Sequence, residues 1–170
     1  IKLPDTVNIM IEEESVVYAV KSSDGQWWMM DSDGRVVEQA NNAKAATATQ
    51  LLGVTLEAPA VNQKGIATEM TPSETNELGE LIPVTTTGAQ RLTAALQIFK
   101  ALESNDIVGE AASVDVTSTE DIILWYGTRY QVNLGDTSRL DYKIDCMHDA
   151  ILEMSDYQSG VLDVIFTIWP

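Results

Sequence analysis

The chain has 170 residues, of which 45% are hydrophobic, and a formal net charge of -16. This composition is ordinary for a soluble globular domain, and the length allows one large core or two small ones. The acidic excess argues against nucleic acid and anionic membrane surfaces as partners, and the single cysteine, Cys146, excludes an internal disulfide.

The region up to Val37 combines short β-prone runs with tight-turn signals. Asp24-Gly25 lies between two such runs, which is among the strongest hairpin signals. Asp31-Ser32-Asp33-Gly34 lacks the spacing and the distal glutamate of a calcium loop, so we interpret it as a second turn. Alternation and composition predict strands at residues 7–11, 16–20, 27–30 and 35–37.

Trp27 and Trp28 are adjacent, so in a strand their side chains point to opposite faces of the sheet. We expect one of them in the core and the other under a second layer or partly exposed. A partner-binding role for one of these aromatic rings is the alternative.

The middle of the chain shows little periodicity. Residues 40–49 are small and polar and fit either a loop or a weak helix, and residues 51–54 form a short apolar stop. Residues 55–88 contain scattered Pro, Gly and Thr without a sustained period, which indicates an irregular surface stretch or a mobile linker. One short strand is expected near Leu81-Ile82.

The second half has the clearest patterns. Thr87-Gly88 precedes an apolar stripe at helical spacing that ends at Ser104, and a second helix is predicted over residues 140–154. Strands are predicted at residues 113–117, 122–126, 129–134 and 161–169. Because tight turns join most strands, the sequence predicts an α+β fold, with a mostly antiparallel sheet and two main helices packed on one side.

Residues for catalysis or metal binding do not cluster in the sequence. His148 is the only histidine, and it follows Cys146 by two positions, which places the two side chains on different sides of a helix. Asp141 and Asp145 share a helical face, for which a solvated surface is the simpler interpretation. We therefore expect no catalytic, cofactor or metal site.

The last predicted strand, residues 161–169, is apolar on both faces over much of its length. No later element covers it. It is either a central, fully buried strand or an edge strand whose free backbone groups accept a strand from a partner.

Several motifs, in order, resemble one family. Leu3-Pro4-Asp5-Thr6 with the following Glu-rich segment, and the hairpin that contains Gly34, are similar to the end of a POTRA module and the start of the next domain in bacterial FtsQ or DivIB cell-division proteins. Leu134-Gly135-Asp136, Lys143 and the strand that carries Asp163 resemble the distal domain of that family.

The resemblance implies a non-catalytic, extracytoplasmic scaffold of the divisome in a single-pass membrane protein, with the anchor in a segment before Ile1. It implies that residues 1–20 end a truncated POTRA-like module, or are the first strands, and that 21–170 form the β domain, with the irregular surface stretch at 55–88. The implied partners are the small coiled-coil proteins FtsB/DivIC and FtsL. The implied contact residues are Tyr157, Val161, Asp163, Ile165, Thr167 and Trp169.

Two other functions stay open on the residues alone. One is a wall-directed enzyme that uses carboxylates of the acidic surface, which would need two converging carboxyl groups with raised pKa values. The other is a secreted ligand-binding domain that uses Trp27, Trp28 and Trp125 in an aromatic-lined pocket.

Overall fold

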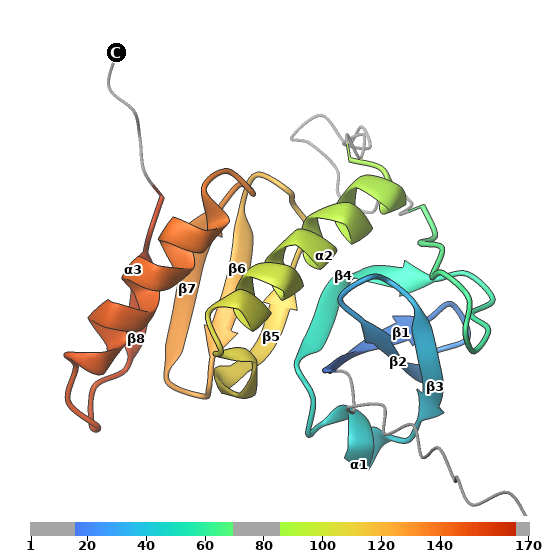
Figure 1. Cartoon of the computed structure of the whole chain (residues 1–170), viewed down its shortest axis with the longest axis horizontal. Helices are drawn as coiled ribbons and strands as arrows, with labels where there is room; N and C mark the ends of the chain where they lie inside the picture. The colour runs from blue at the N-terminus through green and yellow to red at the C-terminus, as the bar shows by residue number, and fades with distance from the viewer. Residues whose placement is uncertain (1–15, 70–85, 166–170) are drawn as a thin grey trace, which may run out of the picture.

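A computed structural model describes residues 16–69 and 86–165 (Figure 1). Three sequence-based expectations lie outside these residues: the strand at 7–11, the short strand near Leu81-Ile82, and the end of the last strand beyond Ile165.

Eight strands form one sheet in the order β3-β2-β1-β4-β5-β6-β7-β8. The β1–β4, β4–β5 and β7–β8 pairs are parallel, and the other four pairs are antiparallel. The predicted α+β class with a mostly antiparallel sheet is therefore confirmed. The strand bounds are β1 (Val17–Ser22), β2 (Trp27–Asp31), β3 (Val36–Ala40), β4 (Gln50–Leu56), β5 (Ala111–Asp115), β6 (Ile122–Tyr126), β7 (Tyr130–Gly135) and β8 (Gly160–Asp163).

The two main helices, α2 (Gly88–Ser104) and α3 (Leu140–Leu152), lie on the same side of the sheet, as predicted (Figure 1). Thr87 caps α2 in a capping box with Gln90, which explains why the helix begins where the Thr-Gly signal stands. The short helix α1 (Asn42–Ala45) packs on the opposite face of β1 and β2, and a 3-10 turn, η1 (Val108–Glu110), leads into β5.

One large core fills the space between the sheet and the two main helices. Phe99 of α2 stacks on Tyr18 of β1 with ring centroids 3.5 Å apart, and Ile144 and Met147 of α3 are fully buried. Each such side chain contributes about 1.5–3 kcal/mol by leaving water. Trp28 packs against this core, and Trp27 packs against a small second cluster under α1, formed by Ala19, Met29 and Ala45. The prediction that the two side chains face opposite sides of the sheet is therefore confirmed.

The central strand β4 was not predicted from the sequence, where residues 51–54 indicated only a short apolar stop. Leu51, Val54 and Leu56 point inward, but their spacing is three residues and then two, because Gly53 interrupts the alternation with a φ of +79°. The register with β1 shifts at the same place. A strand with such an irregularity does not show the strict alternation of apolar and polar residues by which strands are predicted from a sequence.

Candidate functional site

The strand β8 lies at the end of the sheet and pairs with β7 alone among the described strands. Of the two possibilities that the sequence left open, a buried central strand and an edge strand, the structure has the edge strand. Its regular part, Gly160–Asp163, is shorter than the predicted 161–169.

The connection from α3 to β8 is fixed by hydrogen bonds to the β6–β7 hairpin. Arg129 donates from Nη1 to the carbonyl of Asp156 (2.7 Å), and its own carbonyl accepts from the amide of Gly160 (3.0 Å). The amide of Gln158 closes the turn by donating to the carbonyl of Ser155 (2.9 Å). These bonds set the register in which β8 starts beside β7.

The free rim of β8 consists of backbone groups at alternate residues. The amide of Gly160 donates to the carbonyl of Arg129, just before β7, and the amide of Val164 donates to the carbonyl of Asn133 in β7 (3.1 Å). By the alternation of a strand, the N–H and C=O groups of Val161 and Asp163 therefore point away from the sheet. The amide of Ile165 is turned to its own strand and donates to Oδ1 of Asp163 (3.0 Å). This rim can pair with a further strand.

The side chains of β8 divide between the core and solvent as the alternation predicts. Leu162 and Val164 pack on the core, whereas Val161 is 63% exposed and Ile165 48% exposed. Tyr157, in the preceding turn, is 88% exposed. Of the six predicted contact residues, Tyr157, Val161, Asp163 and Ile165 are exposed, with the Ile165 side chain lying over Gly135 of β7, and Thr167 and Trp169 lie outside the described residues.

A buried lysine joins β7 to α3 behind this edge. The Lys143 ammonium donates to the carbonyls of Leu134 (2.8 Å) and Asp136 (2.9 Å) and to Oδ1 of Asp136 (2.9 Å), and Lys143 is only 2% exposed. The hydroxyl of Ser138, and next the Lys143 ammonium, lower the pKa of Asp136 to about 2. Gly135, which lies between Leu134 and Asp136 in the sequence, has a φ of +66° and packs against Ile165.

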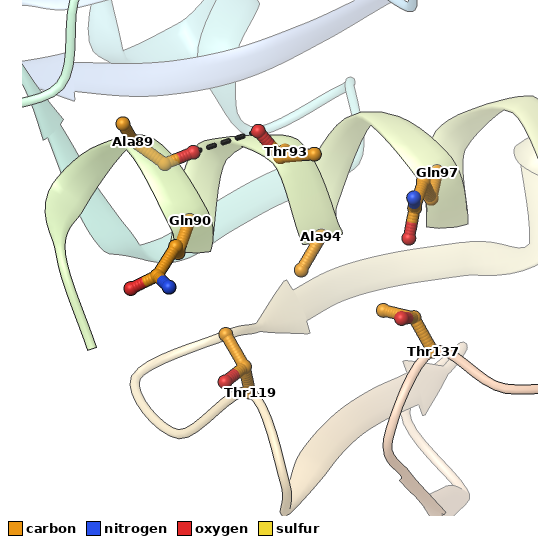
Figure 2. A pocket seen from close by; sticks show the side chains of 7 residues that line it. All are labelled: Ala89, Gln90, Thr93, Ala94, Gln97, Thr119 and Thr137. Atoms are coloured by element: carbon orange, nitrogen blue, oxygen red, sulfur yellow. Dashed lines mark hydrogen bonds between the residues drawn. The ribbon is translucent and has the colours of Figure 1, made fainter. Parts of the chain in front are cut away.

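A polar groove runs between α2 and the loops at the ends of β5 and β7. Figure 2 shows its first part, an open pocket of about 420 Å³ where Gln90, Ala94 and Gln97 of α2 face the loops that carry Thr119 and Thr137. Thr93 is held by its own helix, because its hydroxyl donates to the carbonyl of Ala89 (2.8 Å). A second pocket, of about 640 Å³, continues from Gln97 and Thr137 toward the start of α3.

The enzyme hypothesis needs two converging carboxylates with raised pKa values, whereas hydrogen bonding lowers the pKa of Asp24, Asp33 and Asp136. In the part of the chain that the structure describes, no group of three or more His, Cys, Asp or Glu side chains is placed to hold a metal ion.

The tryptophans do not form the aromatic-lined pocket that the ligand-binding hypothesis needs. Trp27 and Trp28 pack on opposite faces of the sheet, and Trp125 is partly exposed on β6. None of the three lines the α2 groove. Separately, no helix within residues 16–69 and 86–165 has the length and the apolar character needed to cross a bilayer.

The burial of two cationic side chains, Lys143 and Arg91, was not predicted from the sequence. Lys143 occupies a position on the apolar stripe of α3, three residues after Leu140 and four before Met147. Arg91 is fully buried at the start of α2, and its Nε donates to the carbonyl of Gly53 (3.0 Å), which holds the irregularity in β4. A cation within an apolar stripe was the signal available for both.

Comparison with protein-family models, with curated proteins and with solved structures finds no match for this chain.

Proposed function

We propose that this chain is a non-catalytic protein-binding domain that receives a partner strand at the rim of β8. The observation that carries the proposal is that the outward backbone groups of Val161 and Asp163 are unpaired within the described residues, next to the exposed apolar side chains of Val161 and Ile165. Backbone pairing supplies the affinity in such complexes, and alternate side chains supply the specificity.

The two edges of the sheet differ in a way that supports this proposal. At the start of β3 a loop pairs with the edge, because the amide of Val36 donates to the carbonyl of Gln63 (2.8 Å) and the carbonyl of Val36 accepts from the amide of Asn62 (2.7 Å). At β8 no described segment pairs with the rim, and the strand carries no Lys, Arg or Pro, the residues that commonly protect edges. The β3 edge is thus partly paired within the chain, whereas the β8 rim has no described partner.

We propose further that the partner is a small coiled-coil division protein of the FtsB/DivIC type, acting with FtsL. In this proposal the chain is the extracytoplasmic part of a single-pass membrane protein and links components of the divisome. The support is the resemblance carried by Gly135, Asp136, Lys143 and Asp163, residues that lie around the β7–α3–β8 unit and thus next to the open rim.

The test is a binding measurement with the extracytoplasmic part of the FtsB/DivIC-type protein from the same genome. Ile165→Lys and Val161→Lys place a charge beside the rim, so we expect each to weaken binding by about 10-fold or more. Val61→Lys makes the same change at an exposed valine in the loop beside β3, at the opposite end of the sheet, and serves as the matched control.

Equal affinity of the wild-type protein and both β8 variants would reject the rim as the docking site. Absence of binding by the wild-type protein would reject the proposed partner. Urea unfolding of each variant checks that a loss of binding does not come from a loss of folding.

A further inference from the structure

We draw no further inference here: the strongest candidate, the cluster of exposed acidic side chains that Asp141, Asp145, Asp149 and Glu153 form along α3 and its C-cap, is a charged surface to which no second feature of the described residues assigns a ligand.

Discussion

Replacement of Lys143 tests the account of how β7 and α3 are held together. The ammonium of this residue is buried and makes three hydrogen bonds, two to main-chain carbonyls and one to the Asp136 carboxylate. Lys143→Met keeps most of the length of the side chain and removes all three donors. The carbonyl of Leu134, the most buried of the acceptors, then has no replacement for its 2.8 Å bond.

The expected cost follows from those contacts. A buried acceptor left without a donor costs about 1–3 kcal/mol. The Asp136 carboxylate is largely exposed and can be hydrated, and the variant no longer has to bury an ammonium, so these two effects reduce the total. We expect a net loss of about 1–2 kcal/mol in the free energy of unfolding, a measurable share of the stability of an ordinary domain.

Urea unfolding measures this loss directly. With a slope of about 2 kcal/mol per molar urea, Lys143→Met should lower the midpoint by about 0.5–1 M. Lys100→Met is the matched control, because Lys100 pairs with Asp33 on the open surface and its loss should move the midpoint far less. Equal shifts in the two variants would refute the claim that the buried lysine fastens α3 to the sheet.

Two further predictions concern a glycine and a carboxylate. Gly53→Ala should cost about 3 kcal/mol or more in urea unfolding, because the new Cβ at positive φ would lie 2.3 Å from the backbone nitrogen of Thr117, whereas Gly25→Ala, at a similar φ in open space, should cost far less. The pKa of Asp136 is lowered to about 2, so its contribution to stability is present above pH 4 and is lost as the pH falls from 4 to 2. Ser138→Ala removes the largest cause and should raise that pKa in an NMR titration; an unchanged pKa would contradict the assignment.

Patterns that depend on neighbouring residues could be predicted from the sequence. The strand β6 matches its predicted bounds, and α2 begins at its Thr-Gly signal, because local alternation and a capping box determine these features. The strand β4 was missed because its irregularity at Gly53 depends on Arg91, which comes 38 residues later in the chain. Contacts at that separation leave no local period.

The candidate site could be predicted only in part, for a related reason. The sequence showed that the last strand is apolar on both faces, but whether such a strand is central or at an edge depends on the order of all the strands.

Hydrogen exchange at the rim of β8 is the most direct test of the central claim. In the free protein the amides of Val161 and Asp163 have no described backbone acceptor, so they should exchange rapidly. On binding of the extracytoplasmic FtsB/DivIC-type protein, strand pairing should slow their exchange by about 100-fold or more. A complex that forms while both amides continue to exchange at the free rate would contradict the claim that β8 receives a partner strand.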